Sequence, residues 1–301
     1  MHKVLIVDNV DPKAKELLET NGNFTVDIKN GLSREELLET IPAYDSLILR
    51  SGTNVDQEFL DKAENLKFIA RAGAGYNNVD TQYAKQKGVI VTNAPGQNSR
   101  SVAELTLGHM IAISRHIMRA NNTTHDGKWE KKKLVGTEIL GKKLGVIGGA
   151  GNIGSKVAKM GELLGMEVSI YDVPGAQSKF PRLELDELLK TSDYVTIHVP
   201  FMPATKDMLA KEQFELMKPT AYLINTARGG VVNEQDLVDA LNNEELAGAA
   251  MDVCAVEPIE ESNPMRNVKN LHLSPHIGGN TKEAKTNCAV YSAESIIKYF
   301  V

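Results

Sequence analysis

Short runs of aliphatic and β-branched residues alternate with longer amphipathic stretches along almost the whole chain. In the first third, the short runs predict strands at residues 3–8, 24–28, 45–50, 67–71 and 89–92, and the longer stretches predict helices at 12–21, from Ser33 onward, and at 56–64. Parallel strands joined by crossover helices form an open sheet with helices on its faces. The pattern therefore predicts an α/β fold with these apolar residues in its core.

The same alternation resumes near Lys143. It predicts strands at residues 144–147, 167–171, 194–199, 221–225, 249–253 and 271–273, and helices at 152–164, 185–190, 211–217, 234–242 and 282–300. Residues 99–124, between the two halves, are apolar on almost every side, which is typical of a helix buried among several neighbours. We expect one long helix there, connecting two domains that are each a doubly wound parallel sheet.

The composition is that of a globular protein. Of the 301 residues, 42% are hydrophobic and 24% charged, and the formal net charge is −5. An acidic chain has no excess of cations to displace counterions, which argues against general nucleic-acid binding. No apolar run has the roughly 18 residues of a membrane span, and the N-terminal run is too short for a signal peptide. With only two cysteines, Cys254 and Cys288, we expect a soluble cytoplasmic protein without a disulfide framework or a metal site.

Residues 149–154, Gly-Ala-Gly-Asn-Ile-Gly, have the spacing G-x-G-x-x-G between a predicted strand and a predicted helix. The motif alone is a weak signal, because glycine-rich turns match it by chance. However, Asp172 ends the next predicted strand, 18 residues after Gly154, and dinucleotide-binding folds place an acid about 20 residues on. Glycines let a pyrophosphate approach the positive end of a helix, and a carboxylate binds ribose hydroxyls but repels a 2′-phosphate. Since no arginine directly follows Asp172, the segment predicts an NAD site rather than an NADP site.

Three later segments place polar side chains after predicted strands, where ligands bind in an open α/β sheet. Arg228, which precedes Gly229 and Gly230, could bind a carboxylate or form a surface ion pair. Glu257 could be an ordinary loop acid, and His276 an ordinary histidine. Together they would supply an acid/base, an orienting carboxylate and an anion-binding group beside a hydride carrier.

The order of these motifs resembles the D-isomer-specific 2-hydroxyacid dehydrogenases over essentially the whole chain. The matching segments are G-A-G-N-I-G (149–154), Asp172, T-A-R-G-G (226–230), D-V-C-A-V-E-P (252–258) and S-P-H-I-G-G (274–279). Within this family the phosphoglycerate dehydrogenases are the most similar group, on the further segments 50–53, 71–75, 93–99, 126–133 and 280–284. The resemblance implies a Rossmann NAD domain at residues 98–281 and a flavodoxin-like substrate domain made of residues 1–97 and 282–301.

The resemblance also implies roles for individual residues. His276 would be the general acid/base on the C2 hydroxyl, Glu257 would fix its tautomer and favour the imidazolium, and Arg228 would bind the substrate carboxylate and polarise the C2 oxygen. The residues that match the family's NAD contacts are Ala74, Gly149, Gly151, Asn152, Ile153, Gly154, Asp172, Val199, Thr226, Ala227, Asp252, Gly278 and Gly279. The residues that match its substrate contacts are Arg50, Ser51, Arg71, Gly75, Asn98 and Lys131.

Three features depart from the family pattern. Ile147 is followed by Gly148 and Gly149, one glycine more than is usual, which would lengthen the phosphate turn. Ala74 stands where relatives often have threonine. The chain ends at Val301, which implies a form without the C-terminal serine-binding regulatory domains of many relatives.

The resemblance implies that the reaction is oxidation of 3-phospho-D-glycerate by NAD to 3-phosphohydroxypyruvate, the first step of serine biosynthesis. Arg50, Arg71 and Lys131 favour a substrate with a phosphate, although Lys131 could also belong to a solvated basic loop. A hydroxypyruvate or glyoxylate reductase would use the same three catalytic residues, and a corepressor that senses NADH would share the fold. The resemblance further implies a homodimer joined through the NAD domains around the long helix.

Overall fold

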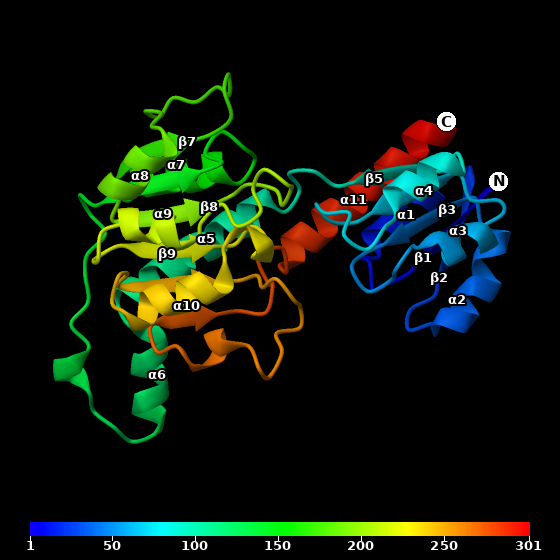
Figure 1. Ribbon diagram of the computed structural model, residues 1–301. Helices are drawn as coiled ribbons and strands as arrows, with labels where there is room; N and C mark the ends of the chain where they lie inside the picture. Colours follow the sequence, from blue (N-terminus) through cyan, green and yellow to red (C-terminus); the bar gives the residue numbers. More distant parts are fainter. The chain divides into compact units, whose positions relative to one another are not determined.

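The computed structural model describes residues 1–301, which form two compact units (Figure 1). Unit 1 contains Met1–Asn98 and Gly279–Val301, and unit 2 contains Ser99–Gly278. These limits lie one and three residues from the expected boundaries after residues 97 and 281. Each unit is built on its own wholly parallel sheet, so the predicted α/β class with two doubly wound sheets is confirmed.

Unit 1 has a five-stranded sheet in the order β2-β1-β3-β4-β5, which is the flavodoxin-like order. The strands are β1 (His2–Ile6), β2 (Phe24–Ile28), β3 (Ser46–Leu49), β4 (Phe68–Arg71) and β5 (Ile90–Asn93). The helices are α1 (Lys13–Asn21), α2 (Arg34–Thr40), η1 (Ile41–Ala43), α3 (Gln57–Lys62), α4 (Thr81–Gln86) and α11 (Lys282–Phe300). The sequence pattern does not predict α4, because its six residues bury only Ala84 and show no apolar periodicity.

Helices cover both faces of this sheet. On one face α1 and α11 bury Leu18 and Ile296 against Val4. On the other face α2 and α3 bury Leu37 and Phe59. The C-terminal helix therefore completes the core of unit 1, although the whole of unit 2 separates it from the other elements along the chain.

Unit 2 has a six-stranded sheet in the order β11-β10-β9-β8-β6-β7. The strands are β6 (Lys143–Ile147), β7 (Glu167–Tyr171), β8 (Tyr194–Ile197), β9 (Tyr222–Asn225), β10 (Gly248–Met251) and β11 (Leu271–Leu273). An isolated parallel bridge between Ile170 and Arg182 adds a further position beyond β7. Numbered from β6, the order then becomes 3-2-1-4-5-6-7, which contains the order 3-2-1-4-5-6 of the dinucleotide-binding Rossmann fold.

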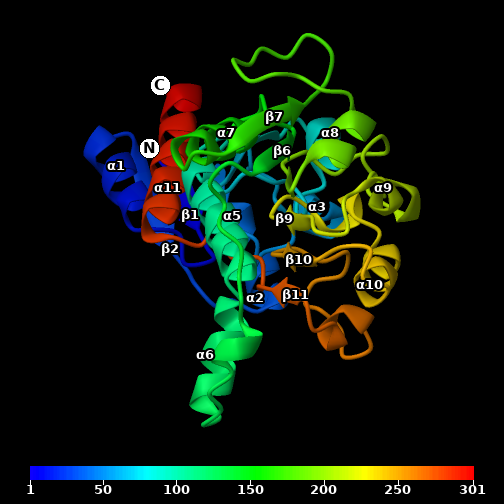
Figure 2. The ribbon, with the colours of Figure 1, turned by 90° about the vertical axis from the view of Figure 1, so that its left-hand side faces the viewer.

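The helices of unit 2 form a layer on each side of its sheet (Figure 2). They are α5 (Ser99–Ser114), α6 (Ile117–His125), η2 (Lys131–Lys133), α7 (Gly154–Leu163), α8 (Leu185–Thr191), α9 (Lys211–Leu216), η3 (Gly229–Val231), α10 (Glu234–Asn242) and η4 (Pro264–Asn267). Helices α5 and α7 share one core with Val146 and Ile224, whereas α8, α9 and α10 share the other with Ile197 and Leu223. In neither unit does a helix combine the length and the apolar character needed to cross a membrane.

The prediction of one long helix over residues 99–124 is wrong. α5 ends at Ser114, and His116 has a left-handed backbone with a φ of 52° before α6 begins at Ile117. α6 has no buried residue, and Ile117 and Met118 are 45% and 49% exposed. Because the apolar pattern continues through the break, periodicity alone does not show where α5 ends.

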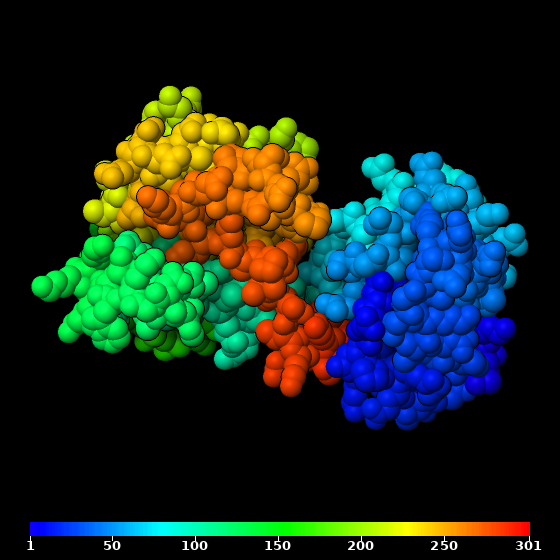
Figure 3. Space-filling view, turned by 90° about the horizontal axis from the view of Figure 1, so that it is seen from below, coloured from blue at the N-terminus to red at the C-terminus, as the bar shows by residue number.

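Residues 117–136, which we call the arm, leave α5 and return to it. The Thr137 amide donates to the Ser114 carbonyl oxygen at 2.9 Å, and His116 Nε2 lies 3.2 Å from the Val135 carbonyl oxygen. Between these contacts the arm extends away from the sheet of unit 2 (Figure 2, Figure 3).

Candidate active site

A histidine and a glutamate form a hydrogen-bonded pair in unit 2. His276 follows β11 and Glu257 follows β10, and Nδ1 of His276 is 2.7 Å from Oε2 of Glu257. Because a carboxylate only accepts hydrogen bonds, Nδ1 carries a proton. Nε2 has no partner in the protein and is the atom that can exchange a proton with a ligand. The two side chains are 47% and 38% exposed, so a small molecule can reach them.

Asp252, which is 1% exposed, holds the backbone that presents His276. Its carbonyl oxygen accepts from the His276 amide at 2.7 Å, and its carboxylate accepts from the amides of Ile277 (2.9 Å) and Gly278 (2.8 Å). These bonds stabilise His276 at a φ of 51°, a left-handed conformation that few residues with a side chain adopt. Oδ2 of Asp252 accepts only one of them and retains capacity for an N–H of a cofactor.

Arg228 lies in the turn after β9. The fully buried Asn225 shapes this turn, because its side chain donates to the Arg228 carbonyl oxygen and accepts from the Ala227 amide, both at 3.0 Å. The guanidinium donates to the Ala227 carbonyl oxygen at 2.6 Å. Burial lowers the pKa of Arg228, and the Glu257 carboxylate opposes that shift. The guanidinium therefore lies within electrostatic reach of the acid/base pair.

The turn with Arg228 packs directly on the segment that leads to Glu257. A Cβ atom at Gly229 would lie 2.0 Å from the Cys254 backbone, so only glycine allows this approach. Burial raises the pKa of the Cys254 thiol to about 11, and nearby carboxylates add to the shift. The Cys254 thiol is therefore neutral at physiological pH.

The glycine turn leaves a cradle of free amides at the start of α7. The amides of Asn152, Ile153 and Gly154 donate to no acceptor in the protein. A Cβ atom at Gly154 would lie 2.2 Å from the Gly148 carbonyl oxygen, so the turn closes tightly only with glycine. Unsatisfied amides at the N-terminus of a ten-residue helix fit the pyrophosphate of a dinucleotide.

The additional glycine, Gly148, begins this turn at the end of β6. Its carbonyl oxygen accepts from the Gly151 amide at 3.1 Å, and its φ is 78°. A Cβ atom there would lie 2.5 Å from the His198 carbonyl oxygen at the end of β8. Glycine is therefore needed where β6 and β8 diverge, the point at which the strand order reverses.

Asp172 directly follows β7 and is bonded to the glycine turn. Its carboxylate accepts from the amides of Ala150 (2.7 Å) and Val173 (2.8 Å). The guanidinium of Arg182, ten residues further along the chain, donates to the Asp172 carbonyl oxygen. Because Arg182 does not directly follow Asp172 in the chain, the sequence pattern does not predict this contact.

Two other expected cofactor contacts lie at neighbouring strand ends. The Thr226 hydroxyl is 2.8 Å from that of Thr106 in α5, which itself donates to the Val102 carbonyl oxygen. Thr226 therefore turns its side chain toward α5, and a cofactor would meet its backbone. Val199 follows β8, and its side chain lies beside Gly148.

In unit 1, the loop after β3 presents two of the expected substrate contacts. The Asp8 carboxylate accepts from the amides of Arg50 and Thr53, each at 2.9 Å, and Asn78 donates to the Arg50 carbonyl oxygen at 2.7 Å. Ser51 is exposed between these anchored residues.

The guanidinium groups of Arg50 and Arg71 both lie near the Cys288 thiol of unit 1. Burial raises the pKa of Cys288 in α11, and both guanidinium groups oppose that shift, which places them within electrostatic reach of the same thiol. The Ala74 carbonyl oxygen, next to Gly75, accepts from Asn93 at 2.6 Å. Near the end of the first segment of unit 1, Asn98 packs against Gly279, where a Cβ atom would lie 2.9 Å from Nδ2 of Asn98.

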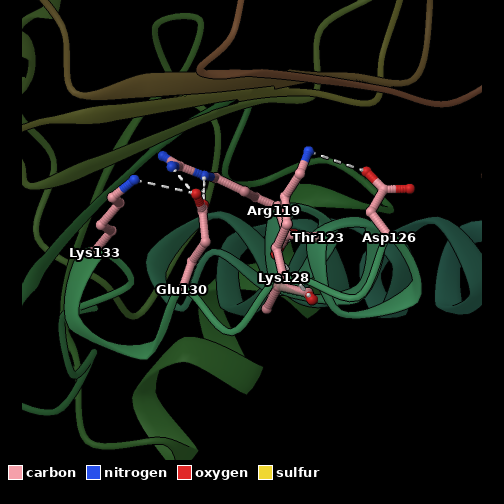
Figure 4. A network of polar contacts seen from close by, with 7 residues as sticks. Arg119, Thr123, Asp126, Lys128, Glu130 and Lys133 are labelled. Atoms are coloured by element: carbon pink, nitrogen blue, oxygen red, sulfur yellow. Dashed lines mark hydrogen bonds and ion pairs between the residues drawn. The ribbon is translucent and has the colours of Figure 1, made fainter.

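Lys131 lies on the arm of unit 2. Figure 4 shows the network beside it, in which Glu130 accepts from Arg119 (2.7 Å) and pairs with Lys133 (3.3 Å). Lys131 and Lys132 have no acidic partner in the chain. Lys131 is therefore free to bind an anion.

Several residues that hold the site are not among those predicted. Asn225 shapes the turn with Arg228, and Glu234 of α10 accepts from the Ala255 amide at 2.5 Å. Ser274 donates to the Asp252 carboxylate, and His109 in turn bonds to Ser274. In the sequence, Asn225 and His109 stand out only as polar residues inside apolar segments, and this feature could have indicated their role. No group of three or more His, Cys, Asp and Glu side chains is placed to hold a metal ion.

Comparison with known proteins shows which family this chain resembles. Residues 107–278 match the D-isomer specific 2-hydroxyacid dehydrogenase, NAD binding domain. The chain is 40% identical over 301 residues to a D-3-phosphoglycerate dehydrogenase from Synechocystis sp., with 98% of this chain and 54% of that protein covered. It thus spans about half the length of the first curated relatives it matches.

Two further proteins are similar over their whole length. A hydroxypyruvate reductase from Thermotoga maritima is 39% identical, with 99% of this chain and 98% of that protein covered. The structure of a 3-phosphoglycerate dehydrogenase from Entamoeba histolytica with NAD+ bound superposes with a TM-score of 0.83 at 26% identity, with 99% of this chain and 95% of that one covered.

Proposed function

This chain belongs to the D-isomer specific 2-hydroxyacid dehydrogenase family, and we propose that it oxidises 3-phospho-D-glycerate to 3-phosphohydroxypyruvate with NAD. The proposal includes a place at the start of serine biosynthesis. It is supported by relatives named D-3-phosphoglycerate dehydrogenase at 40–41% identity.

The observation that carries the proposal is the 2.7 Å contact between His276 and Glu257 with Nε2 left free. During oxidation, Nε2 takes the proton of the C2 hydroxyl as its O–H bond breaks, and Glu257 stabilises the resulting imidazolium. When bound, NAD supplies the acceptor for the hydride that leaves C2. Arg228 binds the substrate carboxylate and polarises the C2 oxygen. In the reverse direction the same Nε2 returns the proton.

The residues proposed to hold NAD follow the ends of β6, β7 and β10. The free amides of residues 152–154 bind the pyrophosphate, and Asp172 binds the adenosine ribose hydroxyls. Oδ2 of Asp252 accepts from the nicotinamide carboxamide.

A phosphate on the substrate would need cations to bind it. Arg50 and Arg71 supply positive charge in unit 1. The arm, which contains Lys131, extends away from the sheet of unit 2, whose strand β11 leads to His276 (Figure 2). We therefore assign Lys131 to the substrate site of a partner subunit.

That assignment requires a homodimer, which we propose forms through α5 and the arm. The arm exposes Trp129 (83%) and Val135 (80%) besides Met118 (49%). Apolar side chains exposed this far from a core are typical of an interface.

A second candidate is a hydroxypyruvate reductase, favoured by the full-length relative of that name. The two functions differ in the need for a phosphate-binding group. An assay of NADH oxidation with 3-phosphohydroxypyruvate, hydroxypyruvate and glyoxylate, each at matched concentration, separates them. We expect the highest kcat/KM for the phosphorylated acid; a preference for hydroxypyruvate would select the second candidate.

The acid/base role has its own test. His276→Ala should lower kcat by about 10²–10⁴ on whichever acid the protein uses, because proton transfer at C2 is lost. NADH binding, followed by nucleotide fluorescence, should survive. A variant with full activity would contradict both candidates.

A further inference from the structure

Helix α5 is apolar along most of its length but directs two polar side chains at the site. Thr106 contacts Thr226, two residues before Arg228, and His109 contacts Ser274, two residues before His276. His109 and Ser274 are 165 residues apart in the sequence, and the distance between Nε2 and Oγ is 3.0 Å. The contact therefore joins the helix layer to the loop that presents the acid/base.

The protons in this contact have only one consistent arrangement. Ser274 Oγ lies 2.5 Å from Oδ1 of Asp252, and a carboxylate only accepts, so Ser274 donates its single proton to Asp252. Ser274 can then only accept from His109, which places the proton of the neutral ring on Nε2. The result is a directed chain from His109 through Ser274 to Asp252.

The far end of the chain reaches His276. Asp252 bonds to the backbone of three successive residues, 276–278, and holds the first of them in its left-handed conformation. Hydrogen bonds in series polarise one another, so donation from His109 strengthens the bond that Ser274 donates to Asp252. Loss of the His109 donor would free Ser274 to rotate and weaken the bond that orients the carboxylate.

We propose that His109 is a positioning residue for His276, acting through Ser274 and Asp252 to hold the loop of residues 276–278. This inference rests on the proposed acid/base role of His276. Burial lowers the pKa of His109, so the ring acts as a neutral donor at physiological pH and not as a charge.

The test compares two substitutions at His109. His109→Gln keeps an N–H near the position of Nε2, whereas His109→Leu removes the donor and retains bulk. With 3-phosphohydroxypyruvate and NADH, or the keto acid that the wild type uses best, we expect His109→Leu to lower kcat about tenfold with KM for NADH changed less than about twofold. His109→Gln should restore kcat to within about threefold. Equal losses in the two variants would show that packing, not donation, matters, and would overturn the proposal.

Hydrogen–deuterium exchange of the ligand-free protein gives a readout that needs no substrate. The peptide of residues 274–280 should exchange faster in His109→Leu and in Ser274→Ala than in the wild type or His109→Gln. Unchanged exchange in both would also overturn the proposal.

Ser114→Ala is the matched control. It removes a buried side-chain hydrogen bond from the same helix, the 2.8 Å contact with Tyr194, that has no path to Asp252. This variant should leave exchange at residues 274–280 and kcat unchanged; the same loss there would mean that general loosening of α5 explains the effect. If His276→Ala is fully active, the proposed function fails; if only His276→Ala is impaired, this inference alone fails.

Discussion

Two acidic residues hold His276 in different ways. Glu257 bonds to the ring and selects the tautomer, while Asp252 bonds to the backbone and selects the left-handed conformation. A general base needs both its proton and its direction set, and the two requirements are met here by residues from the same strand end. The half-exposed ring can thus be reached by a ligand without being free to turn away.

A single residue, Asp172, is also expected to set the preference for NAD over NADP. Asp172→Ala should shift the ratio of kcat/KM for NADP over NAD upward by about tenfold, because the charge that repels a 2′-phosphate is removed while Arg182 stays nearby. Initial rates with both cofactors measure the shift. Asp186→Ala, an exposed acid in α8, is the control. An unchanged ratio would mean that another residue selects the cofactor.

His198, at the end of β8, is a buried group with a pH effect. Neither ring nitrogen has a hydrogen-bond partner, and burial lowers its pKa from 6.5 to about 3. The unfolded chain therefore binds a proton that the folded chain does not as the pH falls below 6.5. The contribution to stability is complete above pH 6.5 and is lost progressively down to about pH 3.

We expect this histidine to lower the free energy of unfolding by about 2 kcal/mol between pH 7 and pH 5. Chemical denaturation at the two pH values measures the loss. His198→Gln, which does not titrate, should remove about that much of the pH dependence, whereas His125→Gln on exposed α6 should not. A steep pH dependence that persists in His198→Gln would assign the effect to other groups.

At the scale of elements, the amphipathic helices and buried strands match the predicted ranges closely, and α10, α11, β7 and β11 match residue for residue. Each is a segment whose periodicity reports its own burial. The break at His116 does not follow this rule, because it depends on contacts of Ser114 and His116 with residues 135 and 137 at the far end of the arm. The residues around His116 do not by themselves show that the chain returns to this point after the arm.

The arm leads to a prediction about Lys131. Lys131→Ala should raise KM for 3-phosphohydroxypyruvate about tenfold, since a cation near the phosphate is lost, and leave KM for hydroxypyruvate nearly unchanged. Lys132→Ala, which removes the adjacent unpaired lysine, is the matched control. Equal effects of Lys131→Ala on both substrates would rule out a phosphate contact.

At the scale of the whole molecule, each unit places its candidate residues, except Lys131, at or after the carboxyl ends of its own parallel strands. In unit 1 these are the ends of β3, β4 and β5, and in unit 2 those of β6 to β11. Both sheets reverse their strand order, at β1/β3 and at β6/β8, which is where open sheets bind ligands.

The proposed assembly is tested by sedimentation. At micromolar concentration we expect a species of twice the 32.9 kDa chain mass. Met118→Glu, which places a charge on the apolar face of the arm, should shift it to the monomer, because an unpaired charge cannot be buried at an interface. Val173→Glu, at an exposed apolar residue far along the chain from the arm, is the control. A wild-type protein that sediments only as a monomer would reject the dimer and the role of Lys131 in a partner's site.

The alternation of strands and helices, the glycine turn and the motif residues Arg228, Glu257 and His276 were all readable from the sequence, because periodicity and motif spacing are properties of short segments. Only the tertiary structure decided that Asp252 holds the loop of His276, that Arg182 reaches Asp172, and that His109 bonds to Ser274. Such contacts join segments that are far apart in the chain. They form only when the elements pack together, and the packing geometry cannot be predicted from any single segment.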